Sequence, residues 1–172
     1  FADEAVDMAL QLFRRETPLT SREAESIFLA MQSVLLHLLT QQRFTEGHLL
    51  AEWLRAQMGR DSGVMKGFRA GYTFDRICAY LAEPAGQPQT ALRWSKAADA
   101  RVREASARQP EVADEALQIS ARLELRARRN QARQLSGDTQ ARLCQLAFRQ
   151  ERKRRFEEAA DIHLMVARAL PP

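Results

Sequence analysis

Residues 137–172 have the sequence GDTQARLCQLAFRQERKRRFEEAADIHLMVARALPP, in which two helical patterns follow one another. Apolar residues recur at helical spacing on both sides of a basic break at 152–155, and a double proline ends the second pattern. Ser136 to Thr139 offer an N-cap to the first helix. Because so short a break makes neighbouring helices antiparallel, this stretch predicts a helical hairpin.

The composition extends this prediction to the whole chain of 172 residues, 45% of which are hydrophobic. Ala and Leu contribute 28 and 21 residues, whereas the β-branched Val and Ile contribute only 6 and 4. Ala and Leu favour helices and β-branched residues favour strands, so we expect an all-α fold. No apolar run is long enough to span a membrane.

Proline and glycine punctuate the chain between periodic stretches, and the intervals between them predict about eight helices. Thr20 or Ser21 caps the second helix, and Asp61 or Ser62 the fourth. The expected helices span approximately residues 2–15, 20–42, 45–58, 63–83, 89–107, 110–135, 139–154 and 156–170. Short connections predict a stack of antiparallel helical hairpins that forms one domain over 1–172, as part of a longer protein.

Similar segments begin at Arg43 (RFTEG) and at Arg155 (RFEEA), and each lies between the two expected helices of a hairpin. In these hairpins the chain resembles tetratricopeptide-repeat (TPR) proteins. Leu143, Leu146 and Ala147 match the large–large–small positions of that family's first helix. The small positions of the second helix correspond to Gly47, Ala91 and Ala159 in three hairpins, and Met31, Val34 and Leu35 precede Gly47. The resemblance covers 28–107 and 138–172 and implies a TPR-like α-solenoid; a generic helical bundle is the alternative.

The repeats are degenerate, because the small residues at 47, 91 and 159 are separated by 44 and then 68 positions. The second interval equals two units of 34 residues, but the first contains ten additional residues, and the long sixth helix fits no single repeat.

Basic residues concentrate near the C-terminal end, since residues 122–172 carry 12 basic and 6 acidic side chains within a chain of net charge +4. Helical spacing aligns a basic strip there, which Arg152 and Arg155 extend at the last turn. The strip comprises Arg122, Arg126, Arg129, Arg133, Arg152 and Arg155. It is either a solvated face of an Arg-rich chain, which we favour, or a site for an acidic peptide or a phosphate backbone. Phe148 and Phe156, the aromatic residues nearby, are expected in the core and thus unable to stack on bases.

Signals for catalysis are missing, so we expect a protein that is not an enzyme and binds no metal or cofactor. His37, His48 and His163 have no partner at metal-ligand spacing, and no serine lies in a nucleophile elbow. Cys78 and Cys144 are isolated and form no disulfide framework, which favours a reduced, cytoplasmic protein. Trp53 and Trp94 are expected between helices rather than as anchors for a partner.

The resemblance also implies a function, because TPR-like stacks bind peptides or helices on a concave surface. The positions that would line this surface are Gln32, Arg76, Tyr80, Cys144 and Gln145. Cys144 and Gln145 depart from the Lys and Asn of the variant that grips chaperone C-termini. We therefore expect a protein-binding scaffold or sensor domain of a bacterial regulatory protein, such as a transcription regulator, or of a secretion-associated one. Nucleic-acid binding by the basic strip is the alternative, and a second copy of the chain stays open as a partner.

Overall fold

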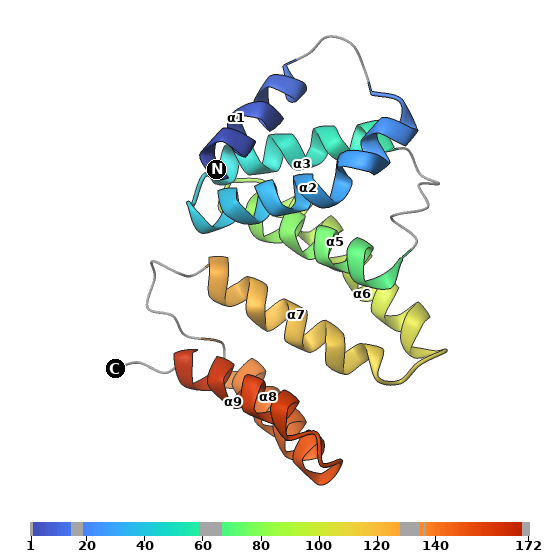
Figure 1. Cartoon of the computed structure of the whole chain (residues 1–172), viewed down its shortest axis with the longest axis vertical. Coiled ribbons are helices and arrows are strands. Elements are labelled where there is room, and N and C mark those ends of the chain that lie inside the picture. The colour runs from blue at the N-terminus through green and yellow to red at the C-terminus, as the bar shows by residue number, and fades with distance from the viewer. Residues whose placement is uncertain (1, 15–18, 59–66, 128–134, 136, 170–172) are drawn as a thin grey trace. The chain divides into compact units, whose positions relative to one another are not determined.

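The chain is helical in a computed structural model that describes residues 2–14, 19–58, 67–127, 135 and 137–169. These residues contain eight helices and no strand, which confirms the all-α prediction (Figure 1). The helices are α1 (Ala2–Phe13), α2 (Ser21–Thr40), α3 (Phe44–Met58), α5 (Phe68–Ala82), α6 (Pro88–Ser106), α7 (Val112–Ala127), α8 (Gly137–Arg152) and α9 (Phe156–Ala169).

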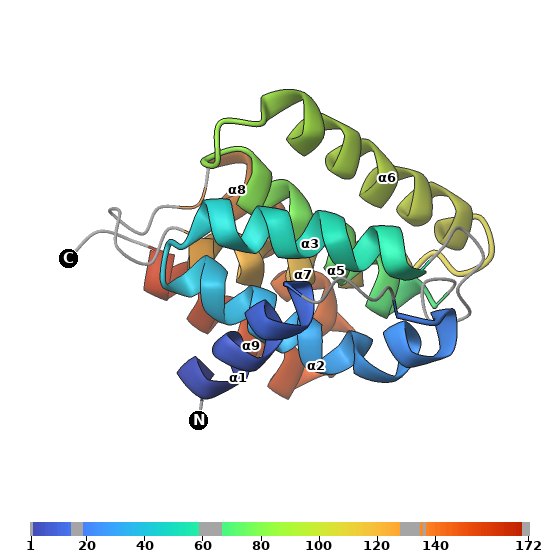
Figure 2. The ribbon, with the colours of Figure 1, turned by 90° about the horizontal axis from the view of Figure 1, so that it is seen from above.

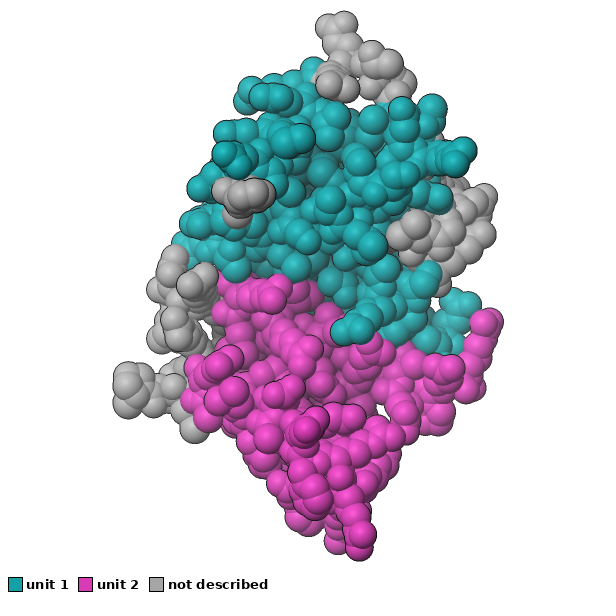
Figure 3. Space-filling view, viewed as in Figure 1, with its two compact units in different colours: residues 1–105 teal, residues 106–172 magenta. Residues whose placement is uncertain are grey.

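The chain divides into two compact units, residues 1–105 and residues 106–172 (Figure 3). Unit 1 contains α1, the antiparallel pair α2 and α3, and the pair α5 and α6 (Figure 2). Unit 2 contains α7 and the pair α8 and α9. A single domain and a TPR-like solenoid stay predictions.

The start of α2 follows its local sequence closely. The Thr20 hydroxyl accepts a hydrogen bond from the Glu23 amide at 3.3 Å, and the Glu23 carboxylate accepts one from the Thr20 amide at 2.9 Å. This capping box satisfies two amides that the first helical turn leaves unpaired, and the hydrogen bonds from Thr20 lower the pKa of Glu23. The predicted cap at Thr20 is confirmed.

One type of turn ends the first helix of all three hairpins. A residue in the left-handed conformation follows that helix: Gln42 with φ 59°, Gly86 with φ 77° and Arg154 with φ 59°. The next amide then donates to the carbonyl five residues before it, from Arg43 to Leu38 at 3.0 Å, from Gln87 to Ala82 at 2.9 Å and from Arg155 to Gln150 at 2.9 Å. This Schellman turn satisfies carbonyls that the helix end leaves free.

A small buried residue follows each left-handed residue at the same distance, five positions later. These residues are Gly47, Ala91 and Ala159, the positions on which the sequence aligns the three hairpins. Their amides donate to the carbonyls of Arg43, Gln87 and Arg155 at 3.0, 3.0 and 3.1 Å, within the first turn of α3, α6 and α9. The three hairpins therefore share one local geometry, although the intervals between them in the sequence are unequal.

Gly47 lies where α3 closely approaches its two neighbouring helices in unit 1. A Cβ atom at this position would lie 2.6 Å from Leu81 Cδ2 on α5 and 3.4 Å from Leu38 Cβ on α2. Leu38 and Leu81 are fully buried, so the small residue lets α3 pack between α2 and α5.

Long side chains hold α6 against α3 and α5. Trp94 is 4% exposed, meets the Phe74 ring edge-on at a centroid distance of 5.9 Å and donates its indole N–H to Glu52 at 2.8 Å. The guanidinium of Arg101 donates to the Asp75 carboxylate at 2.6 Å. Trp94 thus lies in the core, as expected, and Trp53 is half-buried with its ring 6.1 Å from that of Phe13.

Two described helix boundaries differ from the predicted ones by five residues or more, and the others lie within about two residues. The helix α7 is described from Val112 to Ala127, whereas it was expected to reach about residue 135; residues 128–134 lie outside the described part of the chain, and Leu135 itself is not helical. Leu135 nevertheless packs into the core of unit 2, as its place in the apolar pattern suggests. The helix α5 begins after Gly67; Asp61 and Ser62, its expected caps, lie outside the described residues.

Within the described part of the chain, no helix has the length and apolar character to span a membrane.

The close approach at Gly47 predicts opposite effects for two glycine substitutions. Gly47→Ala should destabilise the protein by about 1–2 kcal/mol, because overpacking against Leu81 outweighs the better helix propensity of Ala. Gly137→Ala, at the first position of α8 with no atom within 4 Å of the added Cβ, should stabilise it by up to about 1 kcal/mol. Urea unfolding measures both, and a Gly47→Ala protein at least as stable as the Gly137→Ala protein contradicts the packing argument.

The buried Asp75 predicts a specific pH dependence. Burial raises its pKa, and the Arg101 guanidinium opposes this effect only in part. The folded state therefore binds the proton more tightly than the unfolded state, and this stabilisation is complete below the unfolded pKa of about 3.9 and lost as pH rises through the folded value. Relative to Asp75→Asn, the wild-type protein should lose unfolding free energy as the pH rises from below the unfolded pKa of about 3.9 through the raised folded pKa. A gain over this range, measured by denaturant unfolding, contradicts the prediction.

Candidate functional site

The hairpin of α8 and α9 in unit 2 buries one side of each helix and exposes the other. Its buried residues share a core with Ala121 of α7 and with Leu135. The members from the hairpin are Leu143, Leu146, Ala147, Ile162 and Met165. The opposite sides of α8 and α9 point away from this core, and they carry the candidate site.

Large apolar side chains lie on that outer side. Phe148 is 56% exposed, Phe156 is 65% exposed and Leu164 is 48% exposed. The helical spacing of four aligns Cys144 with Phe148 on α8, and Phe156 with Ala160 and Leu164 on α9. Because α8 and α9 are antiparallel around a turn at 153–155, the two rows lie alongside each other on one face of the hairpin. We call these five residues the hairpin patch.

The exposure of Phe148 and Phe156 overturns the expectation that both belong to the core. Each fits the apolar periodicity of its helix, but α8 turns Leu143, Leu146 and Ala147 inward and thereby turns Phe148 outward. Phe156 is the first residue of α9 and precedes the buried Ala159. Aromatic rings are thus available on the surface beside the basic turn.

A cation accompanies the patch. The guanidinium of Arg152 lies 5.0 Å from the centre of the Phe148 ring, within the range of a cation–π interaction. Arg152 forms no ion pair with any described carboxylate, whereas Arg149 pairs with Asp114 at 2.8 Å and Arg155 pairs with Glu158 at 3.6 Å. The patch therefore combines an apolar surface with an uncompensated positive charge.

Three residues of the expected concave surface lie in unit 1. The Gln32 side chain is 9% exposed and donates to the Ala70 carbonyl at 2.8 Å, which joins α2 to α5. Arg76 donates to the Tyr80 hydroxyl at 2.9 Å, and its guanidinium also lies 5.0 Å from the centre of that ring. Arg76 and Tyr80 thus contact each other on α5, while the side chain of Gln32 links α2 to α5.

The other two residues of that set, Cys144 and Gln145, lie on α8 in unit 2, and both are exposed. Cys144 belongs to the hairpin patch, and in the alignment on the small residues it corresponds to Gln32 and Arg76. Because these two residues and the other three belong to different units, a common concave surface for all five stays a prediction.

The basic strip is described in part. Arg122 and Arg126 are exposed on α7, Arg152 stacks on Phe148 and Arg155 pairs with Glu158. Arg129 and Arg133 lie outside the described residues. The four described members have different surroundings, and two of them contact side chains of the α8–α9 hairpin.

Asp75 is a buried charge that the sequence analysis did not single out. The alignment of the three hairpins could have identified it. Asp75 occupies the position of Met31 and Leu143, both of which are buried and apolar. A carboxylate at such a position needs a partner, and Arg101 on the next helix supplies it.

Two histidines of the described part of the chain contact a carboxylate. His163 contacts Glu151 across the hairpin at 3.0 Å, and His37 contacts Asp3 at 3.2 Å. No group of three or more His, Cys, Asp or Glu side chains that could hold a metal ion occurs among the residues of the described segments.

Comparison with known proteins adds no relative: no family model, no curated protein and no solved structure matches the chain.

The two cysteines should differ in reactivity with a thiol reagent. Cys144 is exposed, whereas Cys78 is 1% exposed and burial raises the pKa of its thiol well above the ordinary value. We expect the folded protein to release one equivalent from Ellman's reagent and the unfolded protein two. Cys144→Ser should abolish the reaction of the folded protein and Cys78→Ser should leave it unchanged; the reverse pattern contradicts the placement of both residues.

Proposed function

We propose that this chain is a non-enzymatic helical domain that binds another protein, and that the hairpin patch receives an amphipathic helix of the partner. The exposure of Phe148, Phe156 and Leu164 on one hairpin face carries this proposal. An aromatic side chain can bury about 150–250 Å². Somewhat more than half of Phe148 and of Phe156 is exposed, and contiguous apolar surfaces of this kind mark sites of interaction.

The positive charge of Arg152 indicates what charge the partner helix should carry. Arg152 lies over the Phe148 ring without a carboxylate partner among the described residues, so a helix that brings a carboxylate to the edge of its apolar stripe complements the patch. Two antiparallel helices form a shallow groove between them, which suits a third helix with apolar residues at spacings of three and four.

The resemblance to TPR proteins supports the same class of function, because Cys144 and Phe148 lie on the first helix of their hairpin, the helix that lines the binding surface in that family. The setting we propose is a regulatory or secretion-associated protein of a bacterium. In such a protein, binding of a peptide or partner would alter an attached output domain. Residence in the cytoplasm is part of this proposal.

Binding of a single-stranded nucleic acid is the second candidate. The observation that favours it is the exposed pair of Phe148 and Arg152, because bases stack on aromatic rings and guanidinium groups attract phosphates. Arg122 and Arg126 would extend the contact along α7, where both are exposed.

The test compares substitutions of exposed apolar residues inside and outside the hairpin patch. Phe148→Ala and Leu164→Glu should each weaken capture of a protein partner from nuclease-treated extract by about tenfold or more, since buried interface anchors contribute about 2 kcal/mol. Leu92→Glu on α6, at 49% exposure against 48% for Leu164, is the matched control and should leave capture unchanged. Circular dichroism should show the same helix content and melting temperature for all three variants.

Two results separate the candidates. Capture that disappears after nuclease treatment and falls steeply with salt supports the nucleic-acid candidate instead. Capture that survives Phe148→Ala and Leu164→Glu at full strength excludes the hairpin patch as the binding surface.

A further inference from the structure

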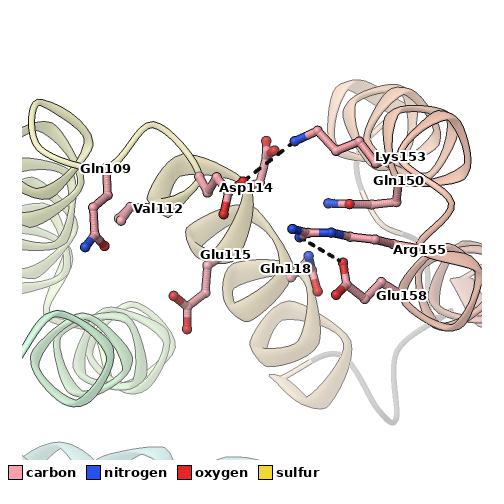
Figure 4. Close-up of a pocket in the computed structure, with 10 residues that line it drawn as sticks. Gln109, Val112, Asp114, Glu115, Gln118, Gln150, Lys153, Arg155 and Glu158 are labelled. Carbon is pink, nitrogen blue, oxygen red and sulfur yellow. Dashed lines mark ion pairs between the residues drawn. The ribbon is translucent and has the colours of Figure 1, made fainter.

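A polar pocket of about 300 Å³ lies within unit 2, between the start of α7 and the turn that joins α8 to α9. Figure 4 shows the Gln150 side chain extending from the hairpin toward α7, and the Gln118 side chain extending from α7 toward the hairpin. The volume is at the lower end of the range for small-molecule sites, which suits a small ligand or a single side chain.

Gln150 is the unusual residue of this pocket. It is 6% exposed, and its Oε1 atom is buried without a hydrogen-bond partner. A buried polar atom without a partner costs stability, and native proteins keep few of them. Gln150 therefore supplies a hydrogen-bonding group that the fold itself leaves unused.

The other hairpins show that the turn does not require an amide at this position. The backbone carbonyl of Gln150 accepts from Arg155, just as those of Leu38 and Ala82 accept from the equivalent residues of their turns. Leu38 and Ala82 are apolar and fully buried. An apolar side chain thus serves the same turn twice in this chain, and the polar one occurs in the hairpin that lines the pocket.

The charged groups that line the pocket already have partners. The ion pairs are Lys153 with Glu111 at 3.8 Å, Arg155 with Glu158 at 3.6 Å and Asp114 with Arg149 at 2.8 Å. Glu115, the remaining carboxylate of the lining, also interacts with another group. A charged ligand therefore competes with a pair that exists in the free protein, whereas a neutral ligand does not.

The side-chain amides are the polar groups that stay available. Neither Gln118, which is half-buried on α7, nor Gln150 makes a side-chain hydrogen bond with another residue that the structure describes. Each amide carries an N–H donor and a C=O acceptor side by side in one plane. Another carboxamide complements such a group, because each of the two can donate one hydrogen bond and accept one in return.

The lining also limits the rest of the ligand. Val112 is the apolar residue of the pocket, and no aromatic ring occurs among the described residues that line it. A flat aromatic ligand finds no ring to stack on there, and a bulky apolar one finds little surface to cover. The polar head of a small aliphatic molecule fits these walls.

We propose that this pocket binds a neutral aliphatic carboxamide, which Gln150 holds through a reciprocal pair of hydrogen bonds and Gln118 contacts from α7. The last torsion of a glutamine side chain is soft, so the Gln150 amide turns its unpaired Oε1 atom from the protein toward the NH₂ group of the ligand. Its Nε2 atom donates to the ligand carbonyl. The carboxamide belongs either to a small free amide or to an Asn or Gln side chain of a protein partner.

Nuclear magnetic resonance titration of the full chain tests the proposal through the side-chain NH₂ signals of Gln150, which are identified by their absence from the Gln150→Leu spectrum. Propionamide is the free amide and N-acetylglutamine N-methylamide is the displayed one. At least one of them should shift the Gln150 signals saturably, with a Kd of about 10 mM or tighter. Binding of both probes identifies a pocket for free amides, and binding of the blocked glutamine alone identifies one for a protein side chain.

Three further probes have the same shapes and different chemistry. They are propionate, which is charged, N,N-dimethylpropionamide, which has no N–H donor, and N-acetylmethionine N-methylamide, which has no side-chain amide. Each should bind at least about tenfold more weakly than the amide it matches. Equal or tighter binding of any of the three, or failure of both amides to saturate at about 100 mM, overturns the proposal. Because no partner is present, these results leave the hairpin patch untested, and the two proposals fail separately.

Matched variants locate the binding, followed by the backbone amide signal of Arg155. Gln150→Leu should weaken the amide about tenfold and Gln118→Leu about threefold or more, while Gln89→Leu, at an exposed position of α6, should leave the affinity unchanged. Gln150→Leu should fold at least as stably as the wild-type chain, because it removes an unsatisfied buried amide. Gln118→Leu tests the site even where the buried substitution perturbs the fold. Wild-type affinity in either pocket variant overturns the assignment.

Discussion

The left-handed turn at the end of α2, α5 and α8 is the constraint on which the hairpins depend. Reversal of the chain after a helix leaves several carbonyls without partners, and the pair of turn hydrogen bonds at each site satisfies two of them. The next helix then begins at a fixed position, and a small residue enters the space between helices in its first turn. A non-glycine residue adopts the strained conformation at Gln42 and Arg154, and the two turn hydrogen bonds at each site offset its cost.

The sequence predicted this regularity because small residues and apolar periodicity are local signals. The alignment on Gly47, Ala91 and Ala159 identified the correct turns without any knowledge of their hydrogen bonds. Periodicity was less informative about exposure. It cannot distinguish the apolar residues that face a neighbouring helix from those, such as Phe148, that are exposed on the surface.

Tertiary partners explain what local patterns missed. Asp75 is acceptable in the core only because Arg101, 26 positions later, reaches it from α6. The side-chain oxygen of Gln150 has no such partner, although it is buried. The residues at the equivalent place in the other two turns, Leu38 and Ala82, are apolar. A pattern within one helix contains no information about a group on another, so the hairpin patch and the pocket required the structure.

The two ends of α7 are held by different forces. Leu117, Ala121 and Leu125 pack into the core of unit 2, whereas the first turn is linked to the hairpin by the exposed pairs of Asp114 with Arg149 and Glu111 with Lys153. Ionic screening weakens exposed pairs and leaves apolar packing almost untouched. Added salt should therefore weaken the contacts of Glu111 and Asp114 with the hairpin before it affects the packing around Ala121.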